Sequence, residues 1–475
     1  MKFPKKQFMA QCVFLAALIL ASGVYAAYHV LERINVSSAG SQATGPSSTG
    51  YNGGPTGNSY SSSLSESGRY ITFASGASNL VANDTNNKND IFVRDRTRGT
   101  TERINISSAG GEANDWSSSP AISGDGRYIA FASRASNLVT GDTNNLSDIF
   151  VRDRTNGTTE RISINSQGEE TSGSGYSSSW APAISGDGRY VAFESGASNL
   201  VTGDTNNYYD IFVRDRTLGT TERVNISSAG GEANADWSSS PAISGDGRYV
   251  AFESGASNLV SGDTNNLSDI FVRDRTLGTT ERVSVSTTGD EANNGSSSAA
   301  ISRDGRYVAF SSRASNLVAN DTNNKDDIFV RDRTLGTTER VNVSSAGDEA
   351  NDWSYSPSIS GDGRYIAFES GASNLVTGDT NNYYDVFVRD RTLGTTERIN
   401  VSSAGDEANN GSSSPAISGD GRYIVFGSYA SNLIAGDTNN LSDIFMSALK
   451  EKNVGFNWAA FLPSLTNMGK AAKKQ

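Results

Sequence analysis

One sequence phrase is repeated seven times along the chain, at intervals of 58 to 62 residues. The glycine of its Gly-Arg-Tyr triplet marks each copy, at Gly68, Gly126, Gly188, Gly247, Gly305, Gly363 and Gly421. The seventh copy stops at SDIFMSALK and lacks the TTERVNVSSAG that ends the others, while a matching ERINVSSAG stands at 32–40. Because a linear stack would need two caps, an array whose first segment completes its last unit predicts a closed ring.

Each unit contains four short β runs separated by tight turns. In the third copy we expect strands at Ala183–Ser185, Tyr190–Glu194, Asp210–Arg214 and Thr221–Ser227. Glycine supplies positive φ at low steric cost in the Gly-Asp-Gly and Leu-Gly turns between them. Four antiparallel strands per unit predict an all-β, seven-bladed β-propeller, with the last blade completed by Glu32–Ser37.

The phrase SxDGRYxAF…DIFVRDxxxGTTERV resembles the repeats of TolB-like β-propellers, over nearly all of residues 29–449. The resemblance implies the propeller fold, which serves as a binding platform in some proteins and as an enzyme domain in others. Two features depart from the family. The turn reads Ser-Glu-Ser-Gly at Ser65–Gly68 and Ser-Arg-Asp-Gly at Ser302–Gly305, and there are seven units without the α/β domain of six-bladed TolB.

The two ends of the chain differ from the repeats. Residues 1–26 have the pattern of a secretory signal, with Lys2, Lys5 and Lys6 before the apolar run Cys12–Ala21. We therefore expect a secreted or periplasmic protein with a propeller at 27–449, a C-terminal tail at 450–475 and no stable membrane insertion after cleavage. The only cysteine is Cys12, so the mature chain would contain no disulfide.

Charge and composition argue against several functions. A net charge of −12 repels polyanions, so nucleic acid is not an expected partner. His29 is the only histidine, which leaves no basis for a histidine-dependent triad or metal site. The acids repeat almost uniformly between copies, whereas an active site needs residues unlike their counterparts. This symmetry favours binding over catalysis.

The phrase Asp-Thr-Asn-Asn-x-x-Asp recurs in all seven copies and predicts oxygen ligands for calcium. Oxygen donors at positions one, three and seven match the start of a calcium loop, although the Gly and Glu of an EF-hand are absent. The candidate ligands are Asp84, Asn86, Asp90, Asp142, Asn144, Asp148, Asp204, Asn206, Asp210, Asp263, Asn265, Asp269, Asp321, Asn323, Asp327, Asp379, Asn381, Asp385, Asp437, Asn439 and Asp443.

Further carboxylates recur near these loops, in the connection to the next unit and at the end of the second strand. They are Glu112, Glu170, Glu232, Glu291, Glu349, Glu407, Glu194, Glu253 and Glu369. The alternative to a metal site is an Asx turn, in which the last aspartate holds backbone amides before the third strand. Both interpretations remain open from the sequence.

The repeated Arg-Asp-Arg at the end of the third strand predicts a structural role. We expect the aspartate to cap the following hairpin and the arginines to pair with acids of adjacent blades. Arg189 and its equivalents are expected to pair with acids such as Asp187.

Aromatic residues vary between copies on the face where the long loops and the length-variable connections meet. An exposed indole beside carboxylates suits stacking on a sugar, whereas the alternative is that each ring fills a gap between blades. The candidate ligand contacts are Trp116, Trp180, Trp237, Trp353, Tyr208, Tyr209, Tyr383 and Tyr384.

These features predict a noncatalytic, monomeric binding or scaffold protein, stabilised by calcium and presenting its rim loops to a protein or glycan partner. The alternative is a carbohydrate-active enzyme, either a polysaccharide lyase or a glycoside hydrolase. Its acids would come from the variable connections, such as Glu169 or Glu170.

Overall fold

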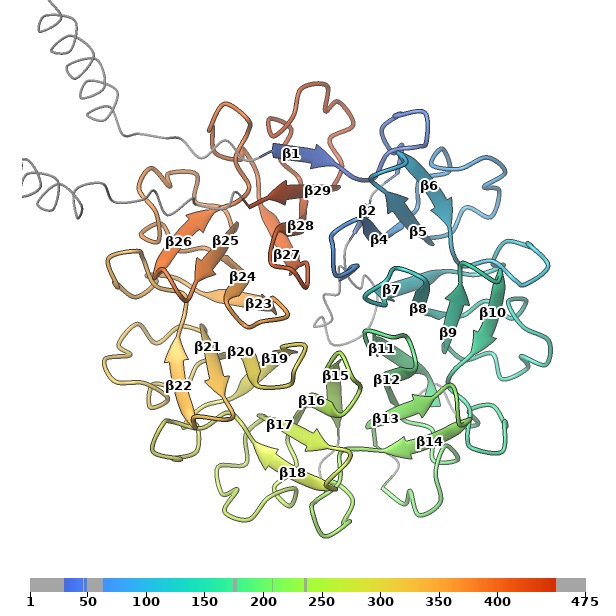
Figure 1. Ribbon diagram of the computed structural model, residues 1–475, viewed down its shortest axis with the longest axis horizontal. Coiled ribbons are helices and arrows are strands. Elements are labelled where there is room, and N and C mark those ends of the chain that lie inside the picture. Colours follow the sequence, from blue (N-terminus) through green and yellow to red (C-terminus); the bar gives the residue numbers. More distant parts are fainter. Residues whose placement is uncertain are drawn as a thin grey trace, which may run out of the picture.

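The chain forms the predicted seven-bladed β-propeller. The computed structural model describes residues 30–45, 47–48, 63–173, 177–206, 208–234 and 237–449, so the proposed signal and tail lie outside the described residues. Within these ranges seven antiparallel sheets stand in a ring and no α-helix occurs (Figure 1). The described residues also contain no helix long and apolar enough to cross a membrane.

We number the blades 1 to 7 in chain order. The first, innermost strands are β2 (Ser47–Ser48) with β3 (Ser63–Leu64) in blade 1, then β7 (Ser117–Ile122), β11 (Ser179–Ile184), β15 (Ser238–Ile243), β19 (Ser296–Ile301), β23 (Ser354–Ile359) and β27 (Ser412–Ile417). The second strands are β4 (Tyr70–Ser75), β8 (Tyr128–Ser133), β12 (Tyr190–Ser195), β16 (Tyr249–Ser254), β20 (Tyr307–Ser312), β24 (Tyr365–Ser370) and β28 (Tyr423–Ser428).

The third strands are β5 (Asp90–Asp95), β9 (Asp148–Asp153), β13 (Asp210–Asp215), β17 (Asp269–Asp274), β21 (Asp327–Asp332), β25 (Asp385–Asp390) and β29 (Asp443–Ala448). The fourth, outer strands are β6 (Thr100–Arg103), β10 (Thr158–Arg161), β14 (Thr220–Arg223), β18 (Thr279–Arg282), β22 (Thr337–Arg340), β26 (Thr395–Arg398) and, in blade 7, β1 (Val30–Arg33).

The outer strand is shorter than the sequence predicted, ending at Arg223 in blade 3 and at Arg33 in blade 7. The reason lies in the side chain of Asn225. Its amide oxygen accepts the hydrogen bond of the Ile211 N–H at 3.0 Å, in place of a backbone carbonyl of the outer strand. A side chain thus ends the ladder two residues after Arg223.

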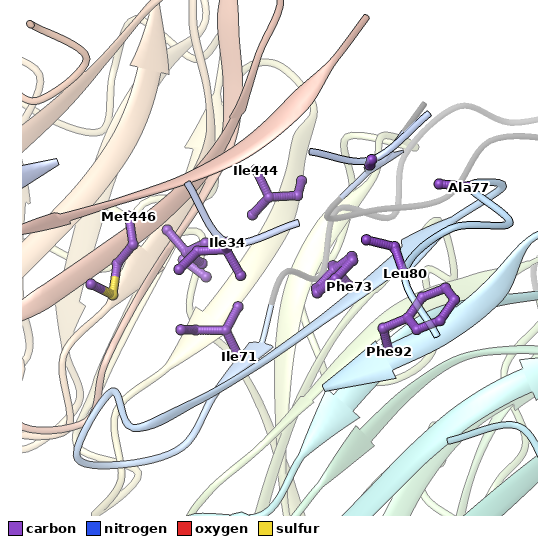
Figure 2. Close-up of a cluster of buried hydrophobic side chains, with 11 residues drawn as sticks. Ile34, Ile71, Phe73, Ala77, Leu80, Phe92, Ile444 and Met446 are labelled. Carbon is purple, nitrogen blue, oxygen red and sulfur yellow. The ribbon is translucent and has the colours of Figure 1, made fainter. Parts of the chain in front are cut away.

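The N-terminal strand closes the ring as predicted. Strand β1 pairs antiparallel with β29, with Glu32 opposite Met446. Just after β1, Ile34 is fully buried in a cluster with Ile444 and Met446 of blade 7 and with Ile71 of blade 1 (Figure 2). The closing segment therefore joins the last blade to the first by packing as well as by backbone hydrogen bonds.

Apolar side chains of the middle strands pack between neighbouring blades, as expected. Between blades 2 and 3, Ile149 and Val151 of β9 meet Val191 and Phe193 of β12 in one buried cluster. Phe193 also stacks on Phe212 of its own blade, with ring centroids 5.9 Å apart. Burial of these side chains, at roughly 25 cal/mol per Å² of apolar surface, holds adjacent sheets together.

A recurrent contact, which we call the interblade clasp, joins neighbouring blades at six of the seven junctions. Between blades 3 and 4 it consists of Tyr190, Glu222, Gly247 and Arg275. The Tyr190 ring packs against Gly247, and the Arg275 guanidinium lies 4.3 Å from the centroid of that ring. Arg275 also pairs with Glu222 at 2.6 Å and donates to the Gly247 carbonyl. This confirms the predicted pairing with an acid of the adjacent blade for the second arginine of the Arg-Asp-Arg sequence. The first arginine, Arg214 in blade 3, instead donates to the Asn165 carbonyl and to the Thr221 hydroxyl.

The aspartate of the same sequence caps its hairpin, as predicted. Asp215 accepts hydrogen bonds from the amides of Thr217 and Leu218. The expected partner of Arg189 was wrong, however. Its guanidinium forms a two-bond pair with Asp215, at 3.0 and 2.7 Å, and Asp187 instead accepts the Arg189 backbone N–H.

We predict that Gly247→Ala destabilises the propeller far more than Gly262→Ala. Both glycines have positive φ, +73° and +78°, but an added methyl group at Gly247 would overlap Tyr190, whereas at Gly262 it meets nothing within 4 Å. The backbone strain at Gly262 is worth about 1–2 kcal/mol. Overlap with the ring adds roughly 1–3 kcal/mol at Gly247. Urea unfolding of both variants measures the difference, and equal losses would show that the tyrosine contact contributes nothing.

Candidate functional site

The long loops and the connections between blades lie on one face of the ring. The loops join second to third strands, and the connections run from each fourth strand to the next first strand. In blade 3, Thr205 of the loop donates to Glu232 of the connection at 2.5 Å. We call this end the variable face. The opposite end, which we call the turn face, carries the hairpins between first and second and between third and fourth strands.

In each of the first six blades an arginine from the outer strand occupies the centre of the acidic loop. In blade 3, Arg223 lies 3.3 Å from Asp204, 2.9 Å from Asp210 and 2.9 Å from Glu232, and its side chain is buried. The equivalent arginines of the other five blades are Arg103, Arg161, Arg282, Arg340 and Arg398. One guanidinium therefore faces three carboxylates in each loop, which leaves a net negative charge.

The asparagine at position three forms the predicted Asx turn. The Asn206 side-chain oxygen accepts a hydrogen bond from the Tyr208 N–H at 2.9 Å, and its amide group donates to the Ala233 carbonyl at 3.3 Å. Asn206 thus fixes the turn before β13 and links it to the connection. These contacts match the Asx turn of the hydrogen-bonded alternative.

The last aspartate of the loop differs from that prediction. Asp210 accepts hydrogen bonds from the side chains of Asn225 and Arg223, while the Ile211 N–H donates to Asn225.

Blade 7 has the same arrangement, assembled from both ends of the chain. Arg33 lies 3.3 Å from Asp437 and 3.4 Å from Asp443. Gln42 replaces the glutamate and donates to both aspartates, at 2.9 and 3.0 Å. Because an amide carries no charge, this loop is less acidic than the other six.

Burial and neighbouring acids alter the protonation of the loops. Desolvation raises the pKa of Asp204 to about 6, and the nearby charge of Asp210 raises it too, while Arg223 lowers it. Among the described residues no group of three or more His, Cys, Asp or Glu side chains is arranged to hold a metal ion. Calcium binding by the 21 loop residues therefore stays a prediction, with arginine as the present counter-charge.

Two of the predicted aromatic contacts stack on each other. Trp116 and Trp180 lie with ring centroids 5.4 Å apart and planes inclined by 12°, and Trp180 also packs against the buried cluster between blades 2 and 3. This pair matches the alternative in which an aromatic ring fills a gap between blades.

Five of the eight predicted contacts are exposed. Exposed fractions range from 36% to 45%, for Trp237, Trp353, Tyr208, Tyr383 and Tyr384. Tyr209 lies beside Trp237, whose backbone it pairs with in an isolated bridge. All five belong to loops or connections of the variable face, as the sequence predicted.

Three aromatic side chains and a lysine lie near the junction of blades 5 and 6 on the variable face. The Lys325 ammonium lies 3.7 Å from the centroid of Trp353 and 3.2 Å from Asp352. Next to it, Tyr355 stacks on Tyr384 with centroids 6.3 Å apart. Tyr355 was missed from the sequence, although it replaces the serine that most copies carry at this position of the inner strand. That departure from the repeat was the available signal.

The centre of the ring holds a second candidate site, a cavity of about 380 Å³ lined by the first strands. At the turn face, turns of neighbouring blades are joined by backbone hydrogen bonds. The Gly124 N–H donates to the Gly186 carbonyl at 2.9 Å, and the Gly186 N–H donates to the Gly245 carbonyl at 2.9 Å. The two turns that depart from the repeat meet at this end, where Glu66 of blade 1 forms an ion pair with Arg303 of blade 5.

The glutamates next to the last residue of the second strands form hydrogen bonds with the inner strand of the next blade. Glu194 accepts the Ser240 N–H of the next inner strand at 3.2 Å, and Glu369 accepts the Ser414 N–H at 2.7 Å. Ser240 and Ser414 have positive φ, at +53° and +54°, in the β-bulge of the inner strand. These glutamates therefore support strained backbone of the adjacent blade, and do not add to the loop carboxylates.

Comparison with known proteins shows likeness of fold. No protein-family model matches the chain, and no curated protein matches it. Among solved structures, an oligogalacturonate lyase in complex with manganese aligns at 12% identity and a TM-score of 0.51, covering 89% of this chain and 93% of the other. The β-propeller domain of the Trilobed protease from Pyrococcus furiosus aligns at 11% identity and a TM-score of 0.48, covering 82% and 97%.

TolB from Acinetobacter baumannii also aligns, at 14% identity and a TM-score of 0.36, covering 84% of this chain and 86% of TolB. A TolB protein is thus among the structures that align with this chain. At these identities the likeness concerns the propeller fold alone.

We predict that Glu253→Gln stabilises the protein at pH 8 and has little effect near pH 4. Burial raises the pKa of Glu253 from 4.5 to about 7, with the Ser298 amide lowering it and Glu194 raising it. The folded state therefore binds a proton more tightly than the unfolded state, and stability falls as pH rises from about 4.5 to about 7. Glutamine keeps the acceptor oxygen and removes this loss, of about 3 kcal/mol at most.

Urea unfolding of wild type and variant across this pH range measures the effect. A constant difference between the two proteins at every pH would contradict the expected titration of Glu253.

Proposed function

We propose that the protein is an exported, noncatalytic β-propeller that binds a protein or glycan partner through its variable face. The observation that carries the proposal is the exposure of five variable aromatic rings on one face, among carboxylates and amides. Aromatic rings beside polar groups bind large apolar or sugar surfaces at low entropic cost. The protein would act as a monomer whose repeated loops offer equivalent contacts.

The symmetry of the acids supports binding over catalysis. Glu170, a candidate of the enzymatic alternative, is held by Thr143 and by Arg161 at 2.7 Å, as its counterparts are held in other blades. Glu169 accepts a hydrogen bond from Asn165 at 2.7 Å within its own connection. The lyase among the similar structures shares the fold at 12% identity, which carries no activity to this chain.

The first experiment is a glycan array probed with the mature protein, together with incubation on soluble polysaccharides followed by measurement of released reducing ends and unsaturated products. Binding without product formation supports the proposal. Product formation would contradict it and establish the lyase or hydrolase alternative.

We predict that Trp353→Ala weakens glycan binding about three- to tenfold, because one stacked ring contributes roughly 0.5–1.5 kcal/mol. The matched control is Leu335→Ala, which removes an exposed apolar side chain from the turn face. Affinities from titration calorimetry on the best ligand of the array compare the two variants. Equal affinities in both would place the binding surface elsewhere.

Calcium would add to this function by stabilising the loops that present the aromatic rings. We expect several calcium ions per chain by mass spectrometry and a melting temperature that falls on chelation. Asp204→Asn should reduce the calcium content by one site and spare the others, since each loop is local to its blade. A metal-free protein with an unchanged melting curve in chelator would leave the loops as turns held by their arginine pairs.

A further inference from the structure

One junction of the ring lacks the interblade clasp. In the described residues, arginines 96, 154, 216, 275, 333 and 391 each stack on a tyrosine of the preceding blade. At the junction of blades 6 and 7 the same position is Leu449, whose N–H donates to the Arg422 carbonyl as the arginine N–H does in the other blades. A leucine thus replaces the cation that elsewhere lies over the tyrosine.

This substitution produces a small pocket on the turn face. Its lining includes Tyr365, Val388, Leu393 and Leu449, together with Glu397 and the ion pair of Arg364 with Asp390. Glu397 occupies the position whose counterparts pair with the clasp arginine. What distinguishes this junction in the sequence is Leu449, since the other six copies carry an arginine at this position.

The leucine of the neighbouring hairpin also differs from its equivalents. Leu218, Leu277 and Leu335 are 67–68% exposed at the same position in blades 3 to 5, whereas Leu393 is 43% exposed. Leu393 and Leu449 line the same pocket. They extend the apolar surface from the hairpin to the point where the chain leaves blade 7.

The chain beyond Leu449 has the composition that suits this surface. Lys450, Glu451 and Lys452 come directly after Leu449, and FNWAAFLPSL follows at 456–465. The six residues at 450–455 span at most about 20 Å, so the apolar segment begins within reach of the pocket. Tethering at this distance gives the segment a high effective concentration there.

We propose that residues 456–465 dock on the turn face at the junction of blades 6 and 7, with their aromatic side chains against Leu393, Leu449 and Tyr365. The apolar side chains of the segment would cover the pocket at the position where an arginine lies at the other six junctions. The occupant is therefore part of the same chain, on the face opposite to the proposed partner-binding surface.

Hydrogen exchange of the full mature chain tests this docking. We expect amides of 456–465 to exchange more slowly than in Leu393→Glu, by about tenfold, because a charge in the pocket releases the segment. Leu335→Glu is the matched control, since it places the same charge on the equivalent hairpin of blade 5, and it should leave the exchange unchanged.

A second variant separates release of the segment from loss of folding. Leu449→Arg restores the residue found at the other six junctions and fills the pocket with a cation that can stack on Tyr365. We expect the same increase in exchange at 456–465 with no fall in melting temperature. Full exchange of the segment in the wild type, or equal exchange in all variants, would overturn the proposal.

The exchange rates are to be measured at two protein concentrations. Protection that is independent of concentration supports docking within one chain. Protection that grows with concentration would overturn it in favour of docking on a second copy.

Discussion

The fold depends on the close approach of a tyrosine to a glycine across each blade junction. Gly247 adopts positive φ and has no side chain, and the ring of Tyr190 occupies the space that a side chain would need. The ring is then covered by Arg275, whose charge is balanced by Glu222. Because the Gly-Arg-Tyr triplet supplies both the glycine for one junction and the tyrosine for the next, a single short motif propagates the angle between blades around the ring.

Because one short motif determines every junction, the fold was predictable from the sequence. The site was predictable only in part. Strand order, ring closure and the structural role of Arg-Asp-Arg follow from repetition and from turn residues. The charge arrangement of the acidic loop does not follow from repetition, because Arg223 lies 19 residues after Asp204 along the chain and belongs to the outer strand. A spacing pattern identifies the oxygen donors of one loop, whereas the arginine that pairs with them comes from the outer strand of the sheet.

Residues that differ from their counterparts in the other copies form contacts that the repeat itself does not predict. Glu66 and Arg303 replace the glycine of their turns and meet across the central cavity. Tyr355 replaces a serine and stacks on Tyr384 of the variable face. Each departure is visible in one sequence once the copies are aligned with each other, but its partner is distant along the chain, in another blade for Glu66 and in a loop of the same blade for Tyr355. The structure was needed to pair the departures.

Closure of the ring by β1 also fixes the order of events during synthesis. The buried hydrogen bond from Asn35 to Asp443 joins residues separated by 408 positions. At 5–20 residues per second, roughly 20–80 s pass between synthesis of these two partners. During that time β1 has no strand to pair with, while six blades can already form from neighbouring segments. Strand β1 is thus synthesised first and paired last. In a chain that terminates before β29, the side of blade 1 that packs against blade 7 stays exposed.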